Sequence, residues 1–221
     1  MVDKNLPENI KITLEKKGFI VIPSLQLSTM EGALSTHPDI QLCKISEKLV
    51  VVEPSTFEYY LGQLSPYGIK VIKGTTRVAA GYPKDVPYNL ATNGNIAIHH
   101  FKYTDKAILE NMECNRIQVK QGYGKCNTLF AEDAIITSDF GIYAKIDGRK
   151  LLISPGNIQL EGYEYGFIGG ASGYFGKLYF IGNLHSHPDF DKIDKFLIEC
   201  NIEYESLGLG ILQDYGSLIF F

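Results

Sequence analysis

A phrase that predicts a short helix followed by a strand recurs five times along the 221-residue chain. In each copy, apolar residues three and four positions apart give way to a run of β-branched and aromatic residues. The copies occupy residues 8–24, 56–74, 104–122, 141–156 and 190–208. Their starts are 48, 48, 37 and 49 residues apart. Such regular spacing predicts a repeated supersecondary unit that buries its apolar face against its neighbours.

A second phrase, with alternating apolar residues, accompanies each predicted helix. Its five copies begin at Asp39, Asn95, Asn127, Ser172 and Gly210. The complete unit is therefore strand, strand, helix, strand. The last unit stops after its second strand at the C-terminal end, and the orphan helix and strand at residues 8–24 complete it. This clasp would close a ring of five units and remove a free sheet edge.

We therefore expect a single α/β domain over residues 1–221. The predicted units cover residues 34–74, 89–122, 125–163 and 169–208, and the fifth combines 209–221 with 8–24. A chain of this length can bury enough apolar surface to fold without disulfides or a structural metal.

Composition narrows the functional classes. The net charge of −4 argues against a general nucleic-acid-binding protein. No apolar run reaches the roughly 18 residues that cross a bilayer, and the N-terminal stretch lacks the apolar core of a signal peptide. The four cysteines form no C-x-x-C pair. We therefore expect a reduced, cytoplasmic protein without nucleic-acid or membrane partners and without a cofactor.

The five-unit pattern resembles the pentein, or guanidino-group-modifying-enzyme, fold. The stretches "GYGKCNTLFAEDAIITSDFGI", "LLISPGNIQLEGYEYGFIGGASG" and "DYGSLIFF" look more particularly like an uncharacterised bacterial family, mainly clostridial, of that fold. The resemblance covers nearly the whole chain and implies a five-bladed, pseudo-symmetric α/β-propeller of ββαβ units. The fold includes deiminases and amidinotransferases, and also the non-enzymatic ribosome anti-association factor called initiation factor six. It therefore implies an architecture more than an activity.

The chain departs from the enzymes of this fold at two places. By resemblance, a Cys nucleophile would come from the last unit and a His from the unit before it. The last unit reads "GLGILQDY" and has no Cys, and the fourth unit reads "GGASGY" and has no His. The enzymes of this fold also grip the guanidinium with carboxylates. Only one of these carboxylates has a plausible counterpart in this chain, and that counterpart is Asp39. The usual deiminase residues are thus not visible in this sequence.

Polar residues nevertheless punctuate the predicted first strands of the units. Since side chains alternate between the two faces of a strand, one face of these strands would line the ring axis. The residues expected on that face are Asp39, Gln41, Asn95, His99, Asn127 and Ser172. One interpretation is that they only bond one another and water. The other is a polar pocket in which Asp39 binds a small guanidino, amidine or amide ligand, with Lys125 nearby.

Cys126 in "GYGKCNT" is the candidate nucleophile for an enzyme. The neighbouring Lys125 could lower the pKa of its thiol, and His99 from another unit could serve as its base. A free Cys is also commonly a small buried apolar residue. Two functions therefore stay open: a binding protein for a guanidino-type ligand, or a cysteine-dependent hydrolase or amidinotransferase-like enzyme that uses Cys126, His99 and Asp39.

The run "NLHSHPDFDKIDKF" at 183–196 contains an H-x-H-x-D spacing that can hold zinc. A zinc site of the H-x-H-x-D-H type needs a His directly after the Asp, but Phe190 follows Asp189 here, so the next ligand is missing. We interpret the run as a helix start, capped by Ser186 or His187, with Pro188 at the first helical position. The stretch 75–94 lacks repeat character, and we expect either a packed connection or a lid over the axis.

Overall fold

The computed structural model describes residues 1–221 as a mixed α/β fold, which confirms the expected class. It contains four three-stranded sheets of one topology. In each sheet the first strand pairs antiparallel with the second, and the third strand pairs parallel with the second after a helical connection. The first two sheets are β1 (Leu42–Ser46), β2 (Leu49–Val52), β3 (Lys70–Lys73), and β4 (Ala91–Thr92), β5 (Ile96–His99), β6 (Asn115–Gln118). The other two are β7 (Thr128–Ala131), β8 (Ala134–Thr137), β9 (Lys150–Leu152), and β10 (Ser172–Phe175), β11 (Lys177–Phe180), β12 (Tyr204–Ser206).

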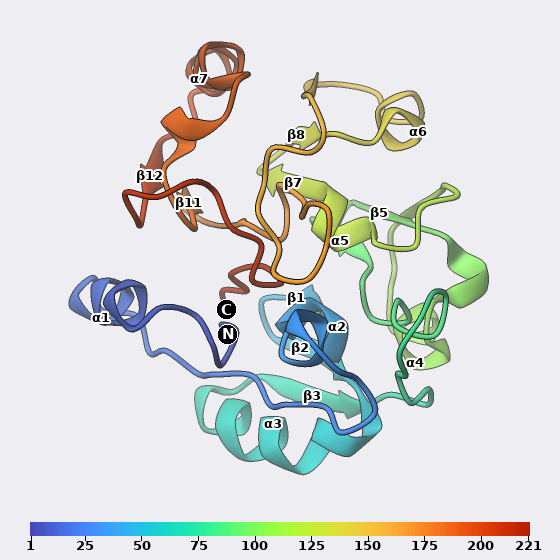
Figure 1. The fold of residues 1–221 in the computed structure, drawn as a ribbon. Coiled ribbons are helices and arrows are strands. Elements are labelled where there is room, and N and C mark those ends of the chain that lie inside the picture. Colours follow the sequence, from blue (N-terminus) through green and yellow to red (C-terminus); the bar gives the residue numbers. More distant parts are fainter.

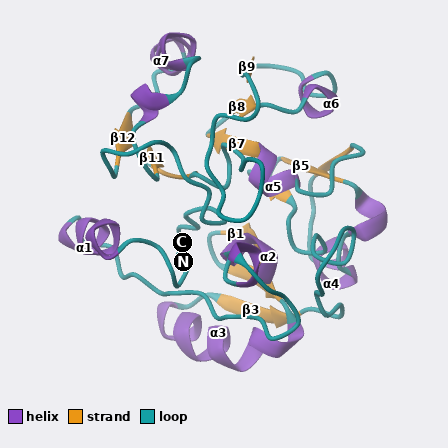
Figure 2. Cartoon of the chain, viewed as in Figure 1, coloured by secondary structure: helices purple, strands orange, loops and turns teal.

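Five helices lie at the periphery, and the first strands β1 and β7 lie nearer the centre (Figures 1 and 2). The peripheral helices are α1 (Glu8–Lys16), α3 (Phe57–Leu64), α4 (Lys106–Glu110), α6 (Phe140–Tyr143) and α7 (Phe190–Glu199). Two short helices, α2 (Pro38–Gln41) and α5 (Gly124–Asn127), lie nearer the centre. Single 3-10 turns cover Ala33–Ser35, Pro54–Thr56, Ser65–Tyr67, Phe101–Tyr103 and Leu184–Ser186. No helix of the chain is both long and apolar enough to cross a bilayer.

Tight turns and apolar middle strands explain the shape of each sheet. In β2, β5, β8 and β11 nearly every residue is buried, because successive side chains point into two different apolar clusters, one on each face of the sheet. The hairpin from β7 to β8 has only two loop residues, and the first of them, Glu132, has a φ of 55°. Such positive φ angles match the twist of the flanking strands in short hairpins.

The two ends of the chain meet near the centre of the molecule (Figure 1). The backbones of Met1 and Ile219 exchange two hydrogen bonds, of 2.7 and 3.1 Å. Val2 forms a parallel bridge to Pro23, and α1 connects these two segments. Leu218 in turn donates its backbone N–H to Ser172 O of the fourth sheet. The sequence analysis expected two strands after residue 209. The structure instead places Met1 and Val2 at the position of the second one, between the C-terminal segment and Pro23.

The buried apolar residues form five clusters, and each cluster joins two neighbouring parts of the fold. One joins the first and second sheets around Val51 and Ala97, and a second joins the second and third sheets around Ile98 and Ile135. A third joins the third and fourth sheets. The last two join the terminal segments to the fourth sheet and to the first sheet. The packing therefore returns to its starting point after one circuit.

Two expected strand starts are helical. Asp39 and Asn127 lie in α2 and α5, and the strands begin only at Leu42 and Thr128. Pro38 at the first turn of α2 favours this, because its fixed φ suits a helix start. The short apolar alternation that follows Asp39 fits one helical turn as well as a strand start, so periodicity could not separate the two.

The second sheet also begins earlier than expected. Its first strand, β4, lies inside the stretch 75–94, and the phrase that starts at Asn95 forms β5, the middle strand. The stretch is a packed connection and not a lid. Val78, Val86 and Tyr88 are fully buried, and the Asp105 carboxylate accepts hydrogen bonds from the backbones of Thr75 and Thr76.

Candidate functional site

Five chain segments meet at the centre of the molecule through a closed circuit of hydrogen bonds. Four are backbone bonds, and the fifth uses the side-chain amide of Asn89. The circuit runs from Asp39 N to Gly216 O (3.2 Å), Ser217 N to Gly170 O (2.8 Å), Gly170 N to Cys126 O (3.1 Å), Lys125 N to Asn89 O (2.9 Å) and Asn89 Nδ2 to Asp39 O (3.1 Å). Gly169 and Gly170 permit this approach, because a Cβ on either would overlap atoms of a neighbouring segment.

The side chains of this circuit form a central polar layer, which consists of Asp39, Asn89, Lys125, Cys126 and Ser217. Asp39 Oδ2 accepts from Cys126 Sγ at 3.2 Å and from Ser217 Oγ at 2.8 Å. Lys125 Nζ donates to Ser217 Oγ at 3.1 Å. Asn89 Nδ2 lies 3.0 Å from Cys126 Sγ. The structure thus brings three of the sequence-predicted residues together, and it adds Asn89 and Ser217, which the sequence analysis did not select.

The environment of Cys126 favours the neutral thiol. Burial raises the pKa of the Cys126 thiol well above its ordinary value, and the carboxylates of Asp39 and Asp214 act in the same direction. The Lys125 ammonium does not offset this, because its hydrogen bond goes to Ser217 Oγ. With its Sγ donating to Asp39, Cys126 serves as a hydrogen-bonded member of the central polar layer and lacks the exposure of a reactive cysteine.

This environment predicts the order of cysteine alkylation. Treatment of the native protein with iodoacetamide at neutral pH should modify Cys114 first, because it is the only cysteine that is not buried. We expect Cys126 and Cys43 to react at least about tenfold more slowly, since each pKa unit removes about nine-tenths of the thiolate. Peptide mass spectrometry over time would measure the rates, and Cys126→Ser should leave Cys114 labelling unchanged. Faster labelling of Cys126 than of Cys114 would restore it as a nucleophile.

His99 belongs to a different network. Its Nδ1 lies 2.6 Å from Thr104 Oγ1 and its Nε2 lies 2.6 Å from Gly122 O. Because the carbonyl only accepts, Nε2 carries the proton and Nδ1 accepts from Thr104. Burial lowers the pKa of His99 to about 4. Both ring nitrogens are therefore occupied, and His99 has no free nitrogen with which to deprotonate Cys126.

The remaining predicted residues have separate positions. Gln41 Oε1 accepts from Tyr60 Oη at 2.7 Å and from Leu25 N at 3.1 Å, so this side chain fixes the segment before α2. Asn95 is exposed in the turn between β4 and β5. Asn127 Nδ2 donates to Tyr123 O within α5. Ser172 Oγ donates to Ile168 O, and the residue lines a cavity described below. These four residues do not converge on one ligand.

A cavity of about 330 Å³, which we call the acidic pocket, lies on one side of the central polar layer. Its polar lining residues are Asp3, Asn5, Thr36, His37, Gln159, Glu161, Gln213, Asp214 and Tyr215. The lining includes three carboxylates and neither Lys nor Arg. The sequence analysis selected neither Asp3, which precedes the first repeated phrase, nor Asp214, which lies within the last one, and the two residues are near opposite ends of the chain.

A buried histidine stands between two of these acids. His37 Nε2 lies 3.9 Å from Asp3 Oδ2, and His37 Nδ1 lies 3.9 Å from Asp214 Oδ1. All three side chains are about 1% exposed, and neither ring nitrogen has a hydrogen-bond partner. Burial raises the pKa of both Asp3 and Asp214. Buried polar atoms normally find partners, so this cluster is incomplete by itself.

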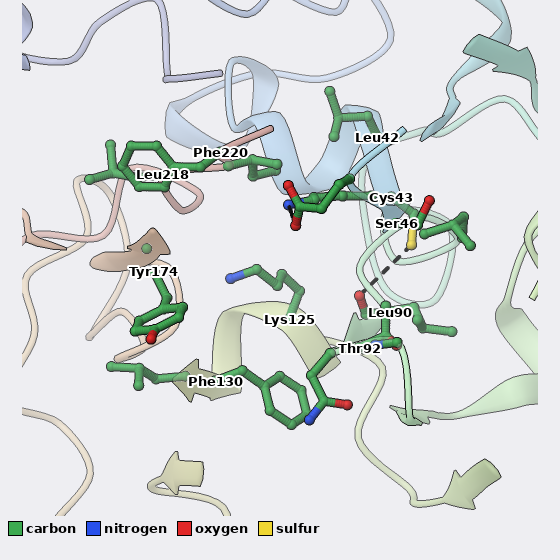
Figure 3. A pocket seen from close by; sticks show the side chains of 18 of the residues that line it. Leu42, Cys43, Ser46, Leu90, Thr92, Lys125, Phe130, Tyr174, Leu218 and Phe220 are labelled. Atoms are coloured by element: carbon green, nitrogen blue, oxygen red, sulfur yellow. Dashed lines mark hydrogen bonds and ion pairs between the residues drawn. The ribbon is translucent and has the colours of Figure 1, made fainter. Parts of the chain in front are cut away.

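A second cavity of about 420 Å³, which we call the lysine pocket, surrounds the side chain of Lys125 (Figure 3). In the segments that cross the layer, residues just before the layer residue line the acidic pocket: His37 comes before Asp39, and Asp214 comes before Ser217. Residues just after the layer residue in the same segments line the lysine pocket: Leu42 comes after Asp39, and Leu218 comes after Ser217. The two cavities therefore lie on opposite sides of the central polar layer.

The H-x-H-x-D run does not converge on one point. His187 Nδ1 accepts from the backbone N–H of Asp189, and the Asp189 carboxylate accepts from Ser154 N. The His185 ring stacks on Phe190 at 3.8 Å. Helix α7 begins at Phe190, two residues later than the expected start at Pro188. In residues 1–221 no three His, Cys, Asp or Glu side chains are arranged to hold a metal ion.

Comparison with known proteins supports a family assignment without a function. The search of curated proteins finds no match. One family model matches residues 1–219, which is nearly the entire chain, and its description is a family of unknown function, DUF6873. The central polar layer, the acidic pocket and all of the lysine pocket except Phe220 therefore fall within the matched region, and the chain belongs to the DUF6873 family.

Proposed function

We propose that the chain is a binding protein for a small cationic ligand of the guanidino or amidine type, which it holds in the acidic pocket. One observation carries this proposal: the buried Asp3 and Asp214 flank the buried His37 at an acid-rich cavity whose lining contains no Lys or Arg. Buried carboxylates are costly unless a positive partner or hydrogen bonds compensate them. Each of the two carboxylates accepts two hydrogen bonds from neutral donors of the protein, and a bound cation would add the positive partner that these donors do not supply.

The chemistry of the lining suits a planar cation. A guanidinium or amidinium presents several N–H donors in a fixed plane and forms paired bonds with carboxylates. Asp3 and Asp214 offer acceptors on two sides of the cavity, and Gln159 and Gln213 add amide oxygens at its edge. A cavity of about 330 Å³ is at the small end of the ligand-site range. We therefore favour a ligand of the size of arginine or agmatine.

We also propose that the architecture is a five-bladed propeller of the pentein type. The four sheets share one topology, and the terminal segments repeat its order of strand, helix and parallel strand. Five apolar clusters and five central hydrogen bonds each return to their starting point. Both observations support five units around one axis. An experimental structure with fewer than five such units would contradict this architecture.

The geometry favours binding over cysteine-dependent catalysis. The Cys126 thiol is 2% exposed and donates to Asp39, and His99 is committed to Thr104 and Gly122. Neither residue lines the acidic pocket. The ligand site that we propose therefore lacks the nucleophile and the base of the alternative enzyme.

The variant Asp3→Asn tests the binding site. An asparagine can accept from Asn5 N and donate to Thr36 Oγ1, so it can keep both hydrogen bonds that Asp3 makes while removing its charge. We expect wild-type protein to bind arginine, agmatine or benzamidine in isothermal titration calorimetry. Asp3→Asn should weaken that binding about 10- to 100-fold, as a charge-assisted bond is lost.

The exposed Asp147→Asn, which has no side-chain partner, is the matched control and should bind as the wild type does. Affinity should also rise with pH, because the raised pKa of Asp3 and Asp214 keeps them protonated longer than ordinary carboxyls and only the ionised forms attract a cation. Absence of binding for the whole panel at millimolar concentration, or equal binding by Asp3→Asn, would overturn the proposal.

A further inference from the structure

The lysine pocket contains one charge that lacks an ionic partner. Lys125 extends from α5 across the middle of the cavity, between Leu218 and Tyr174 (Figure 3). Its Nζ has a single hydrogen-bond partner, Ser217 Oγ at 3.1 Å, and no carboxylate oxygen within 4.0 Å. An ammonium group carries three donors, so two remain available.

The other charged groups of this cavity are already satisfied. Lys44 and Glu47 form an ion pair with each other at 2.6 Å. Glu132 accepts a hydrogen bond from Tyr174 Oη at 2.9 Å. Asp39 lies behind Ser217, which stands between its carboxylate and the ammonium group. Lys125 is therefore the group that an entering ligand would meet as a free positive charge.

Most of the remaining wall is apolar. The side chains that form it are Leu42, Leu90, Leu129, Phe130, Leu218 and Phe220. They come from four separate segments that converge around Lys125 (Figure 3). A cavity that joins one cation to several apolar walls matches a ligand with one anionic head and a hydrophobic body. An inorganic anion would leave those walls without contacts.

We propose that the lysine pocket is a second binding site, which takes a small organic carboxylate with an apolar body and pairs its carboxylate with Lys125. Ionic attraction and hydrogen bonding would act at the head, and burial of apolar surface would act on the body. Burial lowers the pKa of the Lys125 ammonium, and a bound carboxylate would oppose that change. This site is separate from the acidic pocket and does not depend on the cation proposed there.

Calorimetry with a homologous series tests both halves of this proposal on wild-type protein. We expect affinity to increase about fourfold for each methylene from butanoate to hexanoate, because each buried CH₂ contributes about 0.8 kcal/mol. Hexanamide, which keeps the body and removes the charge, should bind at least about tenfold more weakly than hexanoate. Equal binding of hexanoate and hexanamide would overturn the role of Lys125. Binding of inorganic phosphate as tightly as hexanoate would overturn the organic-acid assignment.

Variants then locate the site. Lys125→Met keeps the length of the side chain and should lose the preference for hexanoate over hexanamide, whereas the exposed Lys145→Met should retain it. If Lys125→Met does not fold, the wild-type comparison of acid and amide still decides the outcome. Asp3→Asn should leave hexanoate binding unchanged, so failure of the acidic pocket and failure of the lysine pocket can be distinguished. A preference for hexanoate that survives in Lys125→Met would overturn the proposal.

Discussion

Gly170→Ala is expected to lower the free energy of unfolding by at least about 3 kcal/mol. A Cβ at this position would overlap the carboxyl group of Asp214, which is itself buried and held by the backbone N–H groups of Phe167 and Gly216. The Asp214 carboxyl group cannot move away from the added Cβ without breaking its hydrogen bonds to Phe167 N and Gly216 N. Gly170 also carries two bonds of the central circuit, so a backbone shift would disturb three segments at once. Chemical denaturation followed by circular dichroism would measure the loss.

The matched control is Gly62→Ala in helix α3. A Cβ at Gly62 meets no atom within 4 Å, and the residue lies inside a helix. Because Ala has a higher helix propensity than Gly, we expect a gain of about 0.5–1 kcal/mol. Opposite signs for the two Gly→Ala variants would support close packing at the centre. A near-neutral Gly170→Ala would mean that the central segments are less tightly packed than described.

Phe180→Ala should destabilise the protein by about 3–5 kcal/mol. Phe180 is fully buried at the end of β11 and packs edge-on against Tyr204 of β12. Its removal leaves a cavity in the largest apolar cluster, which joins the third and fourth sheets. Phe140→Ala makes the same chemical change at a side chain that is 69% exposed, and we expect less than about 0.5 kcal/mol there. Similar losses for the two variants would contradict the assigned burial.

The repeated unit could be predicted from the sequence because its signals are local. The periodicity of residues 57–64 and 190–199 is a property of neighbours along the chain, and it marked helices α3 and α7 correctly. Some of the shortest elements left no such signal. Strand β4 has only two residues, and helices α2 and α5 have four each, so their type depends on tertiary contacts.

The composition of the site could be predicted only in part for the same reason. Lys125 and Cys126 were selected because of their adjacency in sequence, and Asp39 was selected because it is an acid near a predicted strand. The acidic pocket instead joins Asp3 to Asp214 through His37, and no pattern in the sequence indicates that these residues meet. His99 was placed on the axis only because β5 was taken for a first strand.

The contact between the ends of the chain has a consequence for folding kinetics. Met1 and Ile219 are separated by 218 residues, whereas the strands within each sheet are close in sequence. Loop closure over so long a separation is entropically costly. We therefore infer that the four sheets form before the backbone pairing of Met1 with Ile219, which we call the seam. Substitutions at the seam should therefore act mainly on the unfolding rate. An open seam would also expose unpaired strand edges, and the terminal segment of a second copy could fill them by domain swapping.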